Sequence, residues 1–149
     1  MGDHLPDLRH LGTKDTRLVA ISRAPNPKLE AFRAKQQWDF TWYSAGEGDF
    51  NYDFGATVDP SRGPVQNNYR SIEELKAEGK HYTENGDLPG LSVFLRQDGQ
   101  IYHTYSTYQR GCEFLLTTLK ILDVTPLGRQ DGPWGPASYK LSSEYAEAD

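Results

Sequence analysis

The residues with the most obvious chemical capacity lie between Tyr102 and Tyr108, in a segment with the composition of a β-strand. Because side chains alternate between the two faces of a strand, His103, Tyr105 and Thr107 are expected on one face. An imidazole beside a phenol can exchange a proton with a small substrate, so we assign His103 and Tyr105 catalytic roles if the chain is an enzyme. The alternative is a half-buried sheet surface whose polar groups are hydrogen-bonded to one another.

The only cysteine, Cys112, is a third catalytic candidate. It follows Arg110 and Gly111 near the expected start of the last helix, where the helix N-terminus and the arginine would lower the pKa of the thiol and make it reactive. The alternative is a small buried residue at a helix start. A single cysteine excludes a disulfide framework, a thiolate metal cluster and a redox-active pair within the chain. It also favours a reducing, cytoplasmic location.

An irregular stretch between the expected elements, Asp49–Phe54, mixes polar and aromatic residues. Within it we assign Tyr52, Asp53 and Phe54 to a binding surface, because such a loop can cover a pocket. In an enzyme, Tyr52 and Tyr105 would orient a small substrate, such as an aromatic one, while His103 acts as acid/base or ligand. The alternative is that the aspartates hydrogen-bond only to the local backbone, as they commonly do in loops.

Nothing in the histidine pattern favours a metal. His4 and His10 are six residues apart, which is not the spacing of two ligands on one helix face. His81 and His103 could join them only through the tertiary fold. We therefore expect no metal and no cofactor.

The charge and hydropathy of the chain limit its partners. The net charge is −5, and acidic and basic residues are mixed without a basic block, so we expect no nucleic-acid binding. No apolar run approaches the length of a membrane span or a secretory signal, so we expect no membrane contact. The cytoplasm is the expected location.

Hydrophobic spacing, Gly and Pro define the elements that must position the candidate residues. We expect strands over 18–21 and 40–43, a helix over 27–37, a capping box formed by Ser71 and Glu74, a hairpin of strands 91–96 and 101–108 around Asp98-Gly99, and a final helix that ends before Pro126. This order predicts an α/β domain with a mixed β-sheet flanked by helices over residues 1–130. A Gly/Pro-rich, charged tail would follow over residues 131–149.

Leu88-Pro89-Gly90, an apolar strand, an Asp-Gly turn, a second strand and a helix follow one another as in the C-terminal half of thioredoxin folds. Longer stretches resemble a bacterial family of uncharacterised thioredoxin-like proteins, often described as predicted dithiol-disulfide oxidoreductases. The resemblance covers roughly residues 3–130, and its blocks are residues 18–25, 48–54, 88–94, 103–108 and 123–129.

The resemblance implies a thioredoxin-like sheet in which Pro89 forms a cis peptide bond beside a ligand-binding groove. Longer members of that family begin with a strand and a Cys-x-x-Cys segment, whereas Asp3–Leu8 looks like the middle of the helix that follows them. The fold would thus lack its first strand and its dithiol centre. A natural loss, a wrongly assigned start and a trimmed chain would each explain this.

These observations predict a binding or redox-inactive member of that family, with a small molecule or a protein as its ligand. Two alternatives stay open. One is an enzyme of a non-thiol type that uses His103 with Tyr105 and Tyr52. The other is a fragment of a complete dithiol-disulfide oxidoreductase.

The missing strand would normally separate the strands at 18–21 and 91–95. Its absence leaves unpaired backbone groups, each of which costs roughly 1–3 kcal/mol when buried. Exposed strand edges invite pairing with another chain. Either the two strands shift together and pair directly, or a second copy of the chain supplies a strand. We expect the second outcome, because direct pairing would force the helices on both faces to repack, and so we expect a homo-oligomer.

Overall fold

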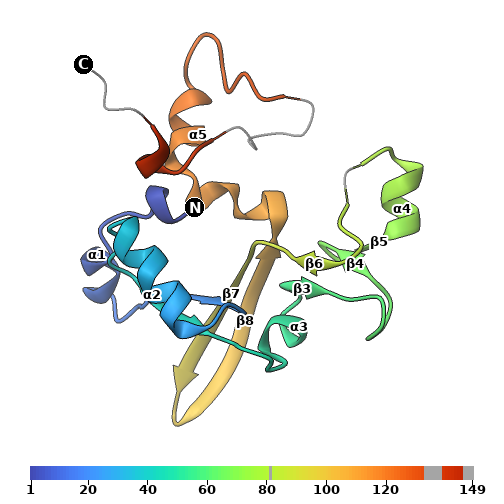
Figure 1. The fold of residues 1–149 in the computed structure, drawn as a ribbon, viewed down its shortest axis with the longest axis horizontal. Coiled ribbons are helices and arrows are strands. Elements are labelled where there is room, and N and C mark those ends of the chain that lie inside the picture. Colours follow the sequence, from blue (N-terminus) through green and yellow to red (C-terminus); the bar gives the residue numbers. More distant parts are fainter. Residues whose placement is uncertain (81, 133–138, 146–149) are drawn as a thin grey trace. The chain divides into compact units, whose positions relative to one another are not determined.

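The computed structural model describes residues 1–80, 82–132 and 139–145. They form an α/β protein with small sheets and several short helices (Figure 1). The chain divides into two compact units. The first unit consists of Met1–Gly48 with Phe114–Asp149, and the second unit consists of Asp49–Glu113.

The first unit is built on two parallel strands joined by a helix. Its elements are α1 (Arg9–Gly12), β1 (Val19–Ser22), α2 (Asn26–Lys35), β2 (Thr41–Ser44), α5 (Thr117–Leu122) and the 3₁₀ helices Gly2–His4 and Ser142–Glu144. β1 and β2 pair in parallel from Val19 opposite Thr41 to Ser22 opposite Ser44. Pro27 stands in the first turn of α2, where its fixed φ suits the helix. The strands and the helix predicted for this region are confirmed.

An aromatic cluster forms the core of the first unit. Phe32 of α2 contacts Trp38 and Trp42, and Phe40 packs against both tryptophans, with ring centroids 5.3–6.2 Å apart. Phe40 is 5% exposed and Leu119 of α5 is fully buried. Aromatic pairs in offset or edge-on geometry add to the stabilisation that burial alone provides.

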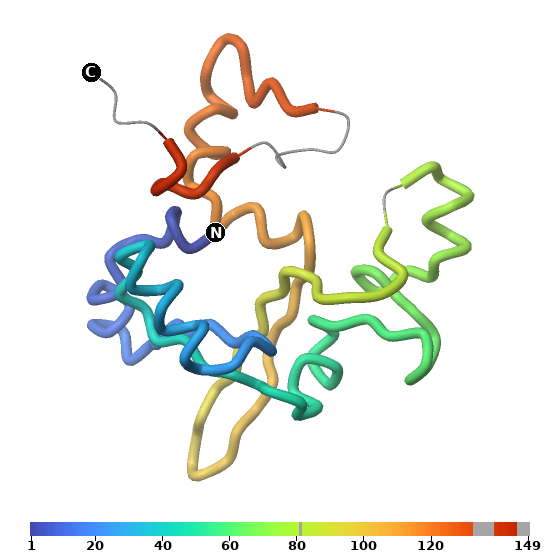
Figure 2. Tube along the Cα trace, in the orientation of Figure 1, coloured from blue at the N-terminus to red at the C-terminus, as the bar shows by residue number. Residues whose placement is uncertain are grey.

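The last described segment returns to the first residues of the chain (Figure 2). The backbone N–H of Ser142 donates to Oδ2 of Asp3 at 2.8 Å, and the Ser142 hydroxyl donates to Oδ1 at 3.0 Å. Tyr139 packs edge-on against His4, whose Nδ1 lies 3.1 Å from the hydroxyl of Thr118. Described residues of the predicted tail thus belong to the first unit. The predicted boundary after residue 130 stays a prediction, and residues 133–138 and 146–149 lie outside the described residues.

The second unit contains three small antiparallel sheets. Its elements are α3 (Phe50–Asp53), β3 (Thr57–Val58), β4 (Gln66–Asn67), β5 (Arg70–Ser71), α4 (Ile72–Ala77), β6 (Gly86–Asp87), β7 (Gly90–Gln97) and β8 (Gln100–Tyr108), and the 3₁₀ helix Gln109–Leu115 follows them across the second boundary. β3 pairs with β6, β4 with β5 and β7 with β8. The predicted capping box is confirmed: Ser71 Oγ accepts from the N–H of Glu74, and the Glu74 carboxylate accepts from the N–H of Ser71.

The β7–β8 hairpin is the longest sheet of the second unit (Figure 1). Asp98 and Gly99 both have positive φ, 52° and 76°, as the tight hairpin turn predicted from this dipeptide requires. The pairing shifts by one residue between Val93 and Phe94, so that Val93 faces Tyr105 and Phe94 faces His103. Thr104 is therefore the extra residue of a β-bulge.

A buried amide, Asn67, ties together three segments of the second unit. Its Nδ2 donates to the carbonyl of Thr83 at 2.8 Å. Its Oδ1 accepts from the N–H of Thr83 at 2.7 Å and from Nε2 of Gln109 at 2.9 Å. Because Asn67 is only 2% exposed, these bonds replace the water that burial removes.

Two expectations about the sheet are wrong. Among the described residues the strands form four two-stranded sheets rather than one mixed sheet, because β1 pairs only with β2 and β7 only with β8. The Leu88–Pro89 peptide bond is trans, not cis. The Pro89 carbonyl instead accepts a hydrogen bond from the N–H of Gln109, at 2.7 Å, where β8 ends.

Candidate functional sites

The imidazole of His103 lies on one face of the hairpin against two phenyl rings. Its ring centroid is 5.3 Å from that of Phe54, which approaches edge-on, and 5.2 Å from that of Phe94. Nε2 is 2.7 Å from Ser106 Oγ, which is in turn 2.9 Å from Ser92 Oγ. These five residues are called the imidazole face below.

The bulge decides which residues share this face. Without it, His103 and Tyr105 would lie on the same side of β8, as regular alternation predicts. The extra residue Thr104 moves His103 to the face of Ser106 and Phe94, whereas Tyr105 stays opposite Val93 on the other face. The expectation that the His103 and Tyr105 side chains share a face is therefore wrong.

The carbonyl of Tyr105 nevertheless reaches the imidazole and favours one of its tautomers. This oxygen lies 3.1 Å from Nε2 of His103. A carbonyl oxygen can only accept, so this contact favours the neutral imidazole with its hydrogen on Nε2, whereas the Ser106 hydroxyl can pair with either tautomer. Nδ1 is then the acceptor of the ring, and the described part of the chain places no hydrogen-bond partner on it.

The loop residues assigned to binding are divided by the structure. The Phe54 ring contacts His103, and it also lies 4.7 Å from Phe50 and 5.0 Å from Phe94 between centroids. Tyr52 instead lies under the guanidinium of Arg62, whose Cζ is 3.9 Å from the centre of the phenol ring. Asp53 is exposed at the end of α3. Phe54 is thus the member of the predicted trio that contacts the imidazole.

The pKa of the Cys112 thiol is shifted in the direction opposite to the one expected. It is 1% exposed, and its Sγ donates weakly to the carbonyl of Thr107 at 3.5 Å. Burial raises the pKa of the Cys112 thiol, because a thiolate is poorly solvated in an apolar surrounding. The surroundings of Cys112 therefore favour the neutral thiol over the reactive thiolate.

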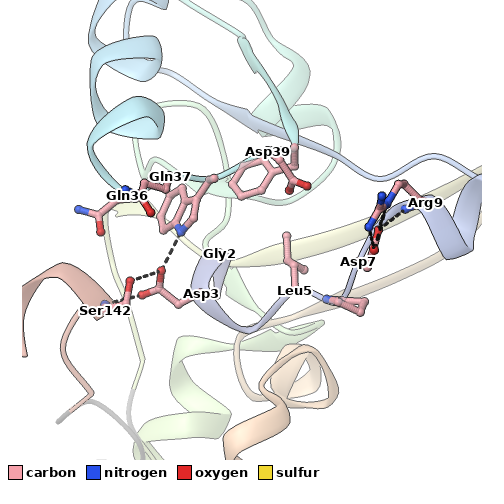
Figure 3. A pocket seen from close by; sticks show the side chains of 12 residues that line it. Gly2, Asp3, Leu5, Asp7, Arg9, Gln36, Gln37, Asp39 and Ser142 are labelled. Carbon is pink, nitrogen blue, oxygen red and sulfur yellow. Dashed lines mark hydrogen bonds and ion pairs between the residues drawn. The ribbon is translucent and has the colours of Figure 1, made fainter. Parts of the chain in front are cut away.

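A cavity of about 500 Å³ lies in the first unit, beside the end of α2. We call it the Trp38 pocket, and the residues lining it are Gly2, Asp3, Leu5, Pro6, Asp7, Arg9, Gln36, Gln37, Trp38, Asp39, Phe40 and Ser142. Figure 3 shows Gln36, Asp3 and Ser142 at one end, the hydrogen-bonded pair of Asp7 and Arg9 at the other, and Leu5 between them. Its volume is that of a small-molecule site, but the hollow is open to solvent and its lining is more polar than apolar.

Asp3 organises one wall of the Trp38 pocket. Its carboxylate accepts from the indole N–H of Trp38 at 2.7 Å as well as from both donors of Ser142. Partial burial acts to raise the pKa of Asp3, but the hydrogen bonds from Ser142 and Trp38 outweigh it and lower the pKa. The pocket therefore carries an ionised carboxylate at neutral pH.

Gln36 lines the same pocket without a partner of its own. It is 6% exposed, and neither the nitrogen nor the oxygen of its amide has a hydrogen bond among the described residues. A buried polar group left in this condition costs about 1–3 kcal/mol. Such groups are rare in folded proteins, and each requires an explanation.

The turn that holds Gln36 is itself strained. The N–H of Gln37 bonds the carbonyl of Ala34, and the N–H of Trp38 bonds that of Arg33, which together form a Schellman motif at the end of α2. The residue at its left-handed position, usually a glycine, is here Gln37 with φ of 56°. This conformation costs about 1–2 kcal/mol for a residue with a Cβ.

A comparison with models of known protein families assigns the chain to a family. A family model described as "Bacterial protein of unknown function (DUF899)" matches residues 1–145. The chain belongs to this family. No curated protein matches the chain, and no solved structure matches it.

The family corrects the resemblance drawn from the sequence. The expected membership of a thioredoxin-like family of predicted dithiol-disulfide oxidoreductases is wrong, because the matching model is that of DUF899 and no thioredoxin-like family model matches. A strand, an Asp-Gly turn, a second strand and a helix form a common order in α/β proteins, so this order is compatible with many folds.

The helices and the side-chain clusters of the described residues bear on membranes and metals. No helix within the described ranges combines the length and the apolar character that crossing a membrane requires. Among the described residues, no three His, Cys, Asp or Glu side chains come together as a metal site requires. His81, one of the histidines considered for such a site, lies outside the described residues.

Sequence reasoning missed the Trp38 pocket and the role of Ser106. Ser106 has no motif around it, and it reaches His103 only because of the bulge. Gln36 and Gln37 stand where a helix should end, and the absence of a glycine there was a usable signal. The left-handed residue at this helix end carries a Cβ, which is a departure from the usual glycine.

Proposed function

We propose that this protein binds a small aromatic hydrogen-bond donor on the imidazole face of its second unit, and that it has no dithiol redox activity. The observation that carries the proposal is the arrangement of His103. Its Nε2 is engaged by Ser106 and by the Tyr105 carbonyl, while its ring lies between Phe54 and Phe94. Nδ1 is left as an acceptor beside two aromatic rings.

The chemistry of this face favours a phenol-like group. An aromatic ring can pack edge-on against Phe54 and Phe94, and its hydroxyl or N–H can donate to Nδ1 of His103. Such a group occurs in a free phenol and in a tyrosine side chain of a protein. Cys112 is the only cysteine of the chain, so no second thiol can resolve a mixed disulfide. Cys112 is also buried.

The test is a titration with two compounds that differ only in the donor. We expect 4-methylphenol to shift the His103 ring resonances in a saturable way, and 4-methylanisole, which lacks the hydroxyl hydrogen, to bind at least about fivefold more weakly. His103→Ala should abolish the difference. His10→Ala, on the exposed surface of the first unit, is the matched control and should not change it. Equal binding of the two compounds would contradict the proposal.

A second candidate function is supported by the contact between Nε2 and Ser106 Oγ. Its 2.7 Å length suits a general base and a nucleophile. Ser106 Oγ would attack the carbonyl of an ester, Nε2 would take its proton, and the departing alcohol would carry that proton away. The Tyr105 carbonyl opposes this function, because it favours the tautomer in which Nε2 already carries a hydrogen. A burst of nitrophenol from nitrophenyl acetate, lost in Ser106→Ala, would favour the esterase over the binding protein.

The proposal includes self-association. Val93, Leu95, Tyr102 and Tyr105 share the second face of the β7–β8 hairpin and are 41–51% exposed. A two-stranded hairpin is marginally stable without further packing, so a second copy of the chain is the proposed cover. Light scattering should give at least a dimer that weakens in Leu95→Lys. A strict monomer at all concentrations would exclude this part of the proposal.

The proposed location is the cytoplasm. It is supported by the unpaired state of Cys112, since a free thiol persists in a reducing compartment. Fractionation of cells that express the protein tests it, and recovery outside the cytoplasm would contradict it.

A further inference from the structure

The Trp38 pocket combines two departures from low-energy design at adjacent positions. Gln36 has a buried amide without a hydrogen-bond partner in the part of the chain that the structure describes, and Gln37 adopts a left-handed conformation. The end of α4 in the second unit shows the ordinary solution: the same Schellman bonds join Gly79 to Lys76 and Lys80 to Leu75, with glycine at the left-handed position. Strain and unpaired polar groups persist where function retains them.

The charge of the lining selects the sign of a ligand. The carboxylates of Asp3, Asp7 and Asp39 stand against two positive charges: the guanidinium of Arg9, which is already bonded to Asp7, and the N-terminal ammonium, whose charge acts on Asp3. Asp3 stays ionised because Trp38 and Ser142 donate to it. A cation is therefore favoured in this pocket over an anion.

The unpaired amide of Gln36 selects the polar edge of the ligand. A carboxamide offers one acceptor and a pair of N–H donors, so its best complement is another carboxamide, which accepts and donates at the same edge. We propose that the Trp38 pocket binds a small cationic aromatic carboxamide, whose amide pairs with that of Gln36.

Binding requires Gln36 to turn toward the ligand. Its amide atoms are out of contact with solvent, so the side chain must rotate before it can meet a ligand in the cavity. The rotation breaks no hydrogen bond of the amide among the described residues, and it removes a buried unpaired group. The ligand would therefore bind the conformation in which Gln36 is rotated.

The aromatic part of the ligand follows from the apolar wall. Trp38 and Phe40 stack on each other with centroids 5.3 Å apart, and Leu5 lies between the two polar ends of the pocket (Figure 3). Gly2 lies against part of the Trp38 indole, so a flat ring can pack against Leu5 and the part of this wall that Gly2 leaves uncovered, while its positive charge lies near the carboxylates. A carboxylate in place of the amide would lose the N–H donors and approach Asp3 with like charge.

The experiment compares 1-methylnicotinamide with 1-methylnicotinate, which has the same charged ring but a carboxylate in place of the amide. Calorimetry and the side-chain amide resonances of Gln36 measure binding. We expect saturable binding of the amide and at least about tenfold weaker binding of the carboxylate. No saturable binding of the amide, or equal binding of the two compounds, would overturn the proposal.

The variant Gln36→Met keeps the length of the side chain and removes the amide. We expect it to melt at a higher temperature than the parent chain and to bind 1-methylnicotinamide at least about tenfold more weakly. Gln100→Met, on the exposed start of β8, is the control and should change neither quantity. Unchanged binding by a folded Gln36→Met protein would overturn the role of the amide.

Discussion

The buried amides of Asn67 in the second unit and Gln36 in the first unit differ in their hydrogen bonding. Asn67 in the second unit is 2% exposed and makes three hydrogen bonds that connect Thr83 and Gln109. Gln36 in the first unit is 6% exposed and makes none among the described residues. The same contrast holds for the Schellman motifs, with Gly79 in the second unit and Gln37 in the first.

The amide of Asn67 stabilises the fold through its hydrogen bonds, whereas the amide of Gln36 is buried without a hydrogen bond among the described residues. In the second unit the buried amide and the helix end both follow the low-energy choice. In the first unit both depart from it, and Ser22 Oγ and Trp42 Nε1 are also buried there without a hydrogen-bond partner among the described residues. Asn68, Tyr69 and Gln109 of the second unit also have positive φ, so the contrast concerns the two amides and the two helix ends rather than backbone strain in general.

The largest expected effect tests the amide of the second unit. Asn67→Leu keeps the side-chain volume but leaves the N–H and carbonyl of Thr83 and the amide of Gln109 without partners. We expect it to lower the free energy of unfolding by about 2–4 kcal/mol. Urea denaturation measures this, with Gln66→Leu at the exposed neighbouring position as the control. A loss no larger than that of the control would mean that the network contributes little.

The amide of the first unit should respond in the opposite direction. Gln36→Met removes a buried donor and acceptor that have no described partner, so we expect a gain of about 1–2 kcal/mol in the free energy of unfolding. The same substitution at the exposed residue next to it, Gln37→Met, should change stability by less than about 0.5 kcal/mol. A loss of stability in Gln36→Met would show that its amide is bonded and that the contrast with Asn67 does not exist.

Local signals in the sequence predict the parts of the fold that neighbouring residues determine. The capping box of Ser71 and Glu74 spans four residues, and the turn at Asp98 and Gly99 spans two, so both are predicted correctly. The end of α2 is not predicted correctly. The sequence pattern extends this helix through Gln37, whereas the helix ends at Lys35 and the chain turns at Gln37 without a glycine. Tertiary packing overrides local preference at that point.

The site is less predictable than the elements. His103 and Phe54 are recognisable as residue types, and they contact each other. The partner of His103 is not predictable, because the bulge at Thr104 has no Gly or Pro to announce it and one extra residue reverses the face. The burial of Gln36 depends on segments far apart in the sequence, and periodicity carries no information about it.

The two helix ends give a prediction of intermediate size. Gln37→Gly should stabilise the first unit by about 0.5–1 kcal/mol, because glycine adopts the left-handed conformation without a Cβ clash. Gly79→Ala should destabilise the second unit by about 1 kcal/mol for the same reason, although open space surrounds its Cβ position. Thermal unfolding of the two variants measures both effects. Effects of the same sign would show that the two motifs are not equivalent.

The smallest expected effect concerns Cys112, the buried thiol of the second unit. Burial raises the pKa of this thiol in the folded chain above its unfolded value of about 8.5. The unfolded chain therefore loses its proton first, and stability falls as the pH rises above about 8.5. We expect Cys112→Ala to remove this slope from the pH dependence of the free energy of unfolding. An identical slope in the variant would assign it to another group.

The hydrogen bonds between Asp3 and Ser142 have a mechanical consequence. They join residues 139 positions apart in the sequence, and so close almost the whole described chain into a ring. A pulling force applied between Asp3 and Ser142 would act on the hydrogen bonds of the Asp3 carboxylate before it acts on the hydrogen bonds between β1 and β2. Once the bonds part, the loss of Ser142 also removes one wall of the Trp38 pocket. The cavity would therefore open under a force too small to unravel the sheet.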